Sequence, residues 1–315
     1  MPMLRAFARN AVTSFVATLP TNTRRSVMKT LADGPHALDL FRAIGLRHGV
    51  RDIVVLGDVG AIEGSLADDH IIAEYAKLKT WKTTELTKLV GGYFDVYKVG
   101  TYVDVGANLG LTTIPIAAMP GVDCIAFEPD PDNFRHLVRN VTAHCRHNNV
   151  KVHEIAVCNH NGEISFECDP HNHGDHRIHV VKSGVLMESE RTVVKVPACR
   201  LDDWFDVDKL KQPIVVKMDV QGSEGHIFAG GERLLSKAEL VFMEYWPYSM
   251  VRFDSDIGAL LSFITKTYST GSMVLGDQDI APDWQPIAEV VKAMRQRWNF
   301  ANIEPFTYHE IYLRK

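Results

Sequence analysis

A glycine-containing turn follows the apolar residues 101–103, and residues 104–110 have the sequence Asp-Val-Gly-Ala-Asn-Leu-Gly. Gly106 allows the backbone to approach a ligand closely. Gly110 lies where a helix is expected to begin, so that free N–H groups point outward. The spacing is not Gly-x-Gly-x-x-Gly, which disfavours a pyrophosphate site. The Asp104 carboxylate would repel a pyrophosphate but attract an ammonium group, so the turn indicates a ligand with a positive charge.

A second acidic residue ends the next apolar run, in the sequence Phe127-Glu128-Pro129. A carboxylate at this position can accept both hydrogen bonds from a ribose diol. The separation between Asp104 and Glu128 fits one strand–helix–strand unit. Together the two segments predict a nucleoside ligand with a positively charged group.

Three more acidic residues follow later apolar runs, at Asp219, Glu224 and Glu244. If their strands are adjacent, Asp219 and Glu244 lie close enough to share a substrate hydroxyl or a cation. The plainer interpretation is that Glu224 favours a helix N-terminus and Asp219 caps that helix. Trp246 could line an acceptor pocket, although an aromatic residue at such a position more often only packs in the core.

The polar segment 159–192 is rich in histidine. We prefer His176 as a general base, because the ordinary histidine pKa of about 6.5 suits proton abstraction near neutrality. Arg177 could hold an anionic acceptor. A metal ion bound by His171, His173 and His176 is an alternative, but the spacing matches no zinc motif and we predict no metal. A solvated polar loop is the third interpretation.

From residue 101 onward, apolar β-branched runs alternate with helical patterns. This alternation is typical of a parallel sheet flanked by helices, and these elements must position the residues named above. The predicted strands are 101–107, 122–127, 150–157, 193–197, 214–220, 240–245 and 306–313, the last as an antiparallel edge. The predicted helices are 68–89, 109–118, 132–144, 223–235 and 255–267. A doubly wound α/β sheet binds ligands beyond the carboxyl ends of its strands, where strand order reverses.

Taken together, these motifs resemble those of the FkbM family of S-adenosylmethionine-dependent methyltransferases. The resemblance covers about residues 65–250 and rests on segments 104–110, 127–129, 154–157, 161–163, 200–203 and 217–224. Residues 174–177 are similar to an element found in part of the family. The resemblance implies a class I methyltransferase sheet, Rossmann-like and mostly parallel with an antiparallel C-terminal strand, that binds S-adenosylmethionine across its strand ends.

The resemblance also implies roles for single residues. It assigns the methionine half of the cofactor to Asp104, Gly106, Asn108 and Gly110, the ribose to Glu128, and the adenine to Ala156 or Val157. Many relatives carry Glu where this chain has Gln221, so one carboxylate is absent here. Methyl transfer requires alignment of acceptor, methyl and sulfur, and a hydroxyl acceptor also requires a base. Our catalytic candidates are His176, Asp219 and Glu244, and our substrate-binding candidates are Arg177, Glu224 and Trp246.

The composition is that of an ordinary globular enzyme: 315 residues, 46% hydrophobic and 23% charged, with a net charge of −5 that favours no nucleic-acid partner. We expect an N-terminal extension over residues 1–64, helical in character, and a methyltransferase domain over 65–315. Five scattered cysteines indicate reduced thiols and a cytoplasmic protein.

The first 32 residues carry basic side chains and no acidic one. Their longest uncharged stretch, 10–23, is shorter than the roughly 20 residues of a membrane span. We therefore expect no transmembrane segment there, and a basic amphipathic cap on the domain, with weak contact to a membrane surface as the alternative.

The expected activity is that of a methyltransferase, with O-methylation of a hydroxyl on a small molecule or glycan as the leading hypothesis. One alternative is a cofactor-binding protein without catalysis in a biosynthetic assembly. A nicotinamide-dependent oxidoreductase is a further alternative, which the absence of Gly-x-Gly-x-x-Gly disfavours.

Overall fold

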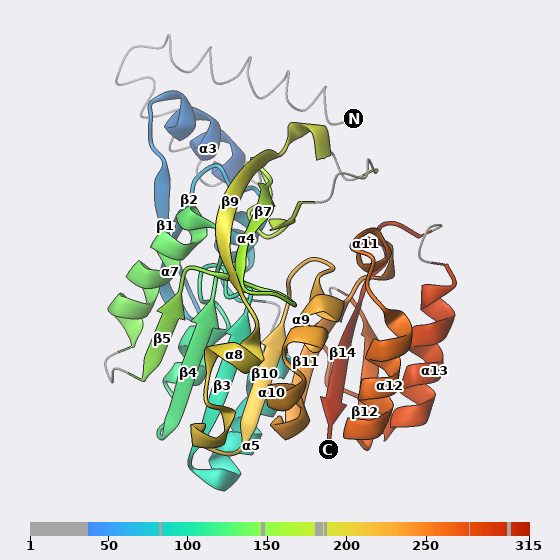
Figure 1. The fold of residues 1–315 in the computed structure, drawn as a ribbon. Coiled ribbons are helices and arrows are strands. Elements are labelled where there is room, and N and C mark those ends of the chain that lie inside the picture. The colour runs from blue at the N-terminus through green and yellow to red at the C-terminus, as the bar shows by residue number, and fades with distance from the viewer. Residues whose placement is uncertain are drawn as a thin grey trace, which may run out of the picture.

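An eight-stranded sheet forms the centre of the computed structural model (Figure 1), which describes residues 37–81, 84–145, 149–179, 185, 188–276, 278–300 and 304–315. The strands lie in the order β13 (Gln285–Pro286), β12 (Thr270–Leu275), β14 (His309–Arg314), β11 (Leu240–Tyr245), β10 (Ile214–Met218), β3 (Gly100–Val105), β4 (Val122–Phe127) and β5 (Val150–His153).

Strand order reverses between β3 and β10. The strands β5, β4, β3, β10 and β11 are parallel, and β14 runs antiparallel to both of its neighbours. The doubly wound, mostly parallel sheet with an antiparallel C-terminal strand is therefore confirmed. The prediction that this strand forms an edge was wrong, because the unpredicted strand β12 pairs with its other side.

Helices cover both faces of the sheet, as the alternation of side chains along each strand requires. Val103 and Val105 pack into one core cluster, and Tyr102 packs into another on the opposite face. The first cluster includes α9 (Glu224–Gly230), α10 (Glu232–Lys237), α12 (Ile257–Thr267) and α13 (Ile287–Trp298). The second includes α5 (Thr84–Tyr97) and α6 (Thr113–Ala117). The single helix predicted over 223–235 is interrupted at Gly231.

A four-stranded sheet stands over the carboxyl ends of the main strands, where β7 and β9 are visible in Figure 1. Its strands lie in the order β6 (Ala156–Val157), β9 (Thr192–Cys199), β7 (Gly162–Cys168) and β8 (Arg177–Ile178). We predicted one strand over 150–157, but the chain leaves the main sheet after β5 and enters this small sheet at β6. The histidine-rich segment is thus partly β-structure.

Buried ion pairs hold the small sheet and the loop 169–176 together. The Arg177 guanidinium lies 2.6 Å from the Glu167 carboxylate and 3.2 Å from Asp175. Arg191 lies 3.0 Å from Asp169 and also contacts Asp175. Both guanidinium groups are buried, and a buried charge is tolerated only with such partners. The network fixes the loop at both of its ends.

The described part of the N-terminal extension combines the helix α3 (Ala37–Arg47) with a hairpin of β1 (Asp52–Gly57) and β2 (Gly60–Ser65). The predicted helical extension thus includes β-structure, and the predicted boundary at residue 64 stays a prediction. The helical region expected over 68–89 is divided into α4 (Ile71–Leu78) and α5. The basic segment, expected to form an amphipathic cap or, as the alternative, to contact a membrane surface, lies outside the described residues.

The hairpin packs on α7 (Pro131–His144) through Asn140, which is 2% exposed. The Asn140 side-chain amide donates to the carbonyls of Glu63 and Leu109, each at 2.9 Å. Its oxygen accepts from the backbone N–H of Glu63 at 2.8 Å. One buried side chain therefore joins the hairpin, α7 and the glycine-containing turn.

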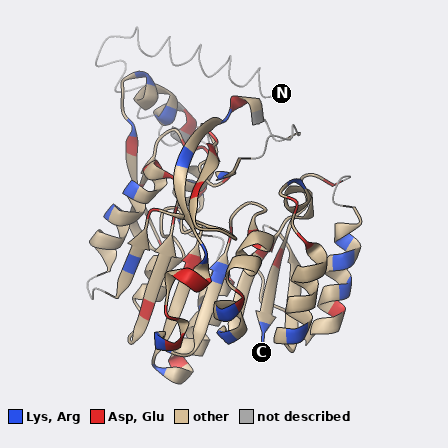
Figure 2. Ribbon diagram, in the orientation of Figure 1, with Lys and Arg blue, Asp and Glu red and all other residues tan. Residues whose placement is uncertain are grey.

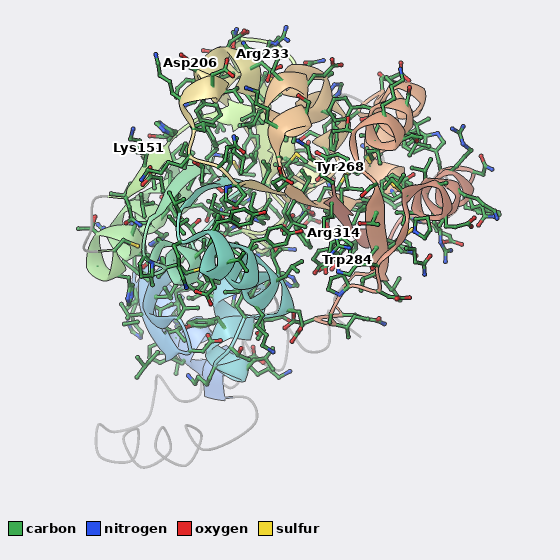
Figure 3. All side chains as sticks on the ribbon, turned by 90° about the horizontal axis from the view of Figure 1, so that it is seen from below. Lys151, Asp206, Arg233, Tyr268, Trp284 and Arg314 are labelled. Atoms are coloured by element: carbon green, nitrogen blue, oxygen red, sulfur yellow. The ribbon has the colours of Figure 1, made fainter. Side chains whose placement is uncertain are left out.

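The opposite end of the sheet is closed by contacts of β14 and α12 (Figure 3). The Arg314 guanidinium lies 4.1 Å from the centre of the Trp284 ring, and its Nε donates to the Thr270 hydroxyl at 3.2 Å. The Tyr268 hydroxyl donates to the carbonyl of Leu235 at 2.8 Å. These contacts hold the C-terminal strand and its helices in place.

Charged residues of both signs are distributed over the outer helices (Figure 2). Among the residues that the structure describes, no helix has the length and apolar character needed to cross a bilayer.

We predict that Asn140→Ala lowers the free energy of unfolding by about 2–3 kcal/mol, because it leaves three backbone groups near the hairpin without their partner. Chemical denaturation of the variant measures this loss. Thr142→Ala, on the exposed side of the same helix, should change stability by less than about 0.5 kcal/mol. Equal stability of the two variants would contradict the bracing role of Asn140.

Candidate functional site

A pocket opens at the carboxyl ends of β3, β4 and β10, at the reversal of strand order. The space that it encloses, open mouth included, is about 870 Å³. The lining residues come from the main sheet, the small sheet and the α4 region. They include Trp81, Gly106, Asn108, Glu128, Ile155, Ala156, Val157, His173, His176, Lys217, Asp219 and Gln221.

Gly106 is required by the close approach of two strand ends. Its φ is +81°, and a Cβ atom there would lie 2.0 Å from the carbonyl oxygen of Asp219. The Asp219 N–H donates to the carbonyl of Val105 at 3.1 Å, which fixes this approach. Gly110 also has a positive φ of +85°, but it lies outside the pocket lining and packs near Leu137.

Asp104 and Lys217 form a buried ion pair below the turn. The Lys217 Nζ lies 3.2 Å from the Asp104 carboxylate and donates to the Gly106 carbonyl at 2.9 Å. Asp104 also accepts from the Thr113 hydroxyl at 2.6 Å. Burial raises the pKa of Asp104, and Lys217 opposes that rise. Asp104, predicted to attract the ammonium group of a ligand, is fully buried outside the pocket lining and instead contacts the ammonium group of Lys217.

Glu128 lies in the pocket with its carboxylate held by two backbone donors. The N–H groups of Asn108 and Asp130 each donate to it at 2.9 Å. Burial, followed by the nearby Asp130 carboxylate, raises the pKa of Glu128 to about 8. Asn108 has a φ of +50°, which turns its N–H toward this carboxylate.

The loop 169–176 is attached to the pocket edge through the backbone of His173. The His173 carbonyl accepts from the side-chain amides of Asn108 at 2.8 Å and Asn133 at 2.9 Å. The His173 N–H donates to Asp68, a buried carboxylate that also accepts from the first turn of α4. The loop therefore covers the part of the pocket that lies near Glu128.

His176 lines the pocket, but both ring nitrogens have neighbours. Nδ1 accepts from the N–H of Asp169 at 3.0 Å, and Nε2 lies 3.8 Å from the Asp130 carboxylate. Burial lowers the pKa of His176 to about 4 despite the opposing effect of Asp130. The ring is thus neutral near pH 7 with its Nδ1 lone pair occupied. A general base at His176 requires the contact with Asp169 to break.

Asp219 presents a carboxylate to the pocket, with 42% of its side chain exposed. Glu224 and Glu244 lie outside the pocket lining, and each has a buried carboxyl oxygen without a hydrogen-bond partner among the described residues. Burial raises the pKa of Glu224 to about 8 and that of Glu244 well above its usual range. The nearby Asp219 contributes to both shifts. Both carboxyls are therefore largely protonated near neutral pH.

Two further predicted residues lie away from the pocket. Arg177 is engaged in the ion pairs of the small sheet, and Trp246 donates from Nε1 to the carbonyl of Pro305 at 2.9 Å. The structure does bring together, around one cavity, five residues predicted to bind cofactor: Gly106, Asn108, Glu128, Ala156 and Val157. Across the described ranges, no three His, Cys, Asp or Glu side chains converge to hold a metal ion.

The lining residues that the sequence did not single out as pocket residues include Trp81, His173 and Lys217. The signal for Lys217 was present, since a lysine inside the apolar strand β10 must find a buried partner. For Trp81 and His173 the sequence carried no such signal, because their positions depend on how distant segments fold over the pocket.

Comparison with known proteins identifies the family. Residues 104–268, just over half of the chain, match the model of the methyltransferase FkbM domain. The 2-O-methyltransferase NoeI of Sinorhizobium fredii is 26% identical over 179 residues, which cover 51% of this chain and 70% of that protein. The hexuronic acid methyltransferase AglP of Haloferax volcanii is 28% identical over 141 residues, covering 45% of this chain and 54% of that protein.

Solved structures resemble the chain more distantly. The precorrin-6y C5,15-methyltransferase of Geobacter metallireducens has a TM-score of 0.36 and 11% identity, over 74% of this chain and 88% of that chain. M. jannaschii TYW2 in complex with AdoMet has a TM-score of 0.38 and 10% identity, over 84% of this chain and 85% of that chain.

We predict that Gly106→Ala lowers the free energy of unfolding by about 3 kcal/mol, because the new Cβ meets the Asp219 backbone and the φ is unfavourable. Denaturant titration measures the change. Gly92→Ala is the matched control, since Gly92 lies exposed on α5 with open space around its Cβ position. That variant should be stabilised by up to about 1 kcal/mol. A Gly106→Ala protein as stable as the control would refute the close approach.

Proposed function

The chain belongs to the FkbM family of methyltransferases, and we propose that it transfers a methyl group from S-adenosylmethionine to a hydroxyl of a sugar or another small molecule. The observation that carries the proposal is the position of the Gly106 turn and the Glu128 carboxylate around one pocket at the reversal of strand order. The two relatives, a 2-O-methyltransferase and a hexuronic acid methyltransferase, support an oxygen acceptor on a sugar.

The pocket residues fit S-adenosylmethionine, which supplies an activated methyl group when bound. The backbone at Gly106 can approach the methionine half closely, and Glu128 can accept from the ribose hydroxyls. Asn108 Oδ1 is buried without a hydrogen-bond partner among the described residues, so it is available to a donor on the cofactor. Ala156 and Val157 offer an apolar surface for the adenine.

Asp219 is our choice for the residue that receives the proton of the acceptor hydroxyl. It lines the pocket at the end of β10, and its side chain is partly exposed, so an acceptor can reach it. His176 is less suited because its Nδ1 already accepts a backbone N–H. Glu224 and Glu244 lie outside the pocket lining, near enough to Asp219 that its charge raises the pKa of both.

We place the reaction in the cytoplasm. Each of the five cysteines is free. Oxidising compartments favour disulfides, so free thiols, two of them only partly buried, are typical of a reducing compartment.

Methyl transfer from labelled S-adenosylmethionine to a panel of monosaccharide glycosides tests the function. Asp219→Asn should reduce kcat at least about 100-fold, the usual contribution of a positioned base, with cofactor affinity within about threefold. Asp95→Asn, an exposed acid on α5, is the matched control and should keep full activity. Cofactor binding without transfer to any acceptor would favour a non-catalytic binding protein, and no cofactor binding would refute the proposal.

The raised pKa of Glu128 gives a prediction for pH. Ribose hydroxyls donate to the ionised carboxylate, so binding favours loss of the Glu128 proton. Affinity for S-adenosylmethionine should therefore rise about tenfold from pH 6 to pH 7 and level off above about pH 8. Isothermal titration over this range measures it, and Glu128→Gln should bind more weakly without the pH dependence. Wild-type affinity that is flat between pH 6 and pH 8 would exclude this role for Glu128.

A further inference from the structure

Gln221 occupies an unusual backbone position in the turn between β10 and α9. Its φ is +57°, a left-handed conformation that is uncommon for residues other than glycine, asparagine and aspartate. The Gln221 carbonyl accepts from the Ser249 hydroxyl at 2.8 Å, which holds the turn. Backbone strain at a pocket is retained where the side chain has a task. Gln221 lines the pocket, so we consider a functional role for its side chain there.

The side-chain amide of Gln221 donates to Asp219 Oδ1 at 2.9 Å. The other carboxylate oxygen, Oδ2, lies 3.9 Å from Lys217 Nζ. The amide and the ammonium group therefore contact different oxygens of the same carboxylate. Two contacts of this kind restrict the rotation of a side chain that is otherwise 42% exposed.

The charged groups near Asp219 come from four elements. Lys217 belongs to the same strand, β10, and Asp104 lies on the adjacent strand β3. Glu224 lies at the start of α9, and Glu244 lies on β11. The Lys217 charge is already paired with Asp104, and Glu224 and Glu244 are largely protonated near neutral pH. A further negative charge at position 221 would therefore face the Asp219 carboxylate itself.

We propose that Gln221 is a positioning residue for the methyl-transfer reaction, whose amide orients the Asp219 carboxylate and keeps it free to accept the proton of the acceptor hydroxyl. The inference rests on the proposed function, in which Asp219 is the base. A neutral donor suits this task because it binds the carboxylate without adding a charge. A glutamate at 221 would place two carboxylates in contact, and one pKa of such a pair is raised, so the pair keeps a proton to higher pH than Asp219 alone.

The Gln221 side chain is longer than those of asparagine and aspartate, which adopt its positive φ more readily. Asparagine adopts positive φ more readily, but its side chain is one methylene shorter and does not span the distance to Asp219 in the same backbone conformation. Gln221→Asn therefore keeps the amide and the turn and removes the contact. This variant separates the role of the contact from the folding of the turn.

The test compares pH–rate profiles and melting temperatures of three variants with the wild type. Gln221→Glu should move the acidic limb of the pH–rate profile to higher pH, so that kcat falls at least about tenfold on the acid side and recovers as the pH rises, with the KM for S-adenosylmethionine within about threefold. Gln221→Asn should reduce kcat at all pH values without moving the profile. Gln296→Glu, the same change on the exposed side of α13, should behave as wild type.

Melting temperature gives a second readout that needs no acceptor. In Gln221→Glu a carboxyl of the contacting pair has a raised pKa in the folded state, so stability relative to wild type is lost as the pH rises from about 5 to 8. Gln296→Glu should show no such trend. A Gln221→Glu protein without this pH-dependent loss would overturn the contact.

The remaining outcomes are distinguishable. Methyl transfer by the wild type together with an unshifted pH profile in Gln221→Glu would overturn the positioning role and leave the proposed function standing. Absence of transfer by the wild type, with cofactor binding intact, would overturn both.

Discussion

The buried ammonium group of Lys217 is the constraint on which the site depends. Burial alone would lower the pKa of Lys217, but the carboxylates of Asp104 and Asp219 outweigh that effect, and the pKa is raised. A charge in the interior needs partners, and its removal would leave the opposite charge uncompensated. The Lys217 ammonium group contacts the Asp104 carboxylate on β3 and the Gly106 carbonyl just after that strand. One side chain of β10 therefore connects the two central strands just below the pocket. The contact with the Gly106 carbonyl also restricts the backbone conformation of the glycine-containing turn, residues 104–110.

Much of the fold could be predicted because its signals are local. Apolar runs with turns at their ends located β4 and β11 at their observed bounds and β3, β10 and α7 within one or two residues. The strand β12 lacks such a signal because it contains Gly271 and Ser272. The helix α13 does have a helical pattern, with buried Ile287, Val290 and Met294, and the prediction omitted it. The division of 150–157 between two sheets could not be inferred, since both halves contain β-branched residues and the separation depends on long-range pairing.

The positions of Gly106 and Glu128 in the pocket lining were predictable, because each directly follows an apolar strand. The site was less predictable where the task of a side chain depends on partners distant in sequence. Arg177 and Asp175 look available in the sequence, yet the fold engages both in the ion pairs of the small sheet. His176 has an ordinary sequence context, but the Asp169 backbone occupies its Nδ1. These partners come from segments whose approach no local pattern encodes.

The hydrogen bonds of Asn140 show that the start of the family match and the start of the packed structural unit differ. By homology the recognised module begins at residue 104, where the family match starts. Mechanically the unit begins earlier, because the amide of Asn140 holds β2 with one set of hydrogen bonds and the Leu109 carbonyl with another. A segment in place of the hairpin would have to return an extended backbone to this amide to keep the same hydrogen bonds. The hairpin is therefore structurally joined to the glycine-containing turn, although the family match begins after it.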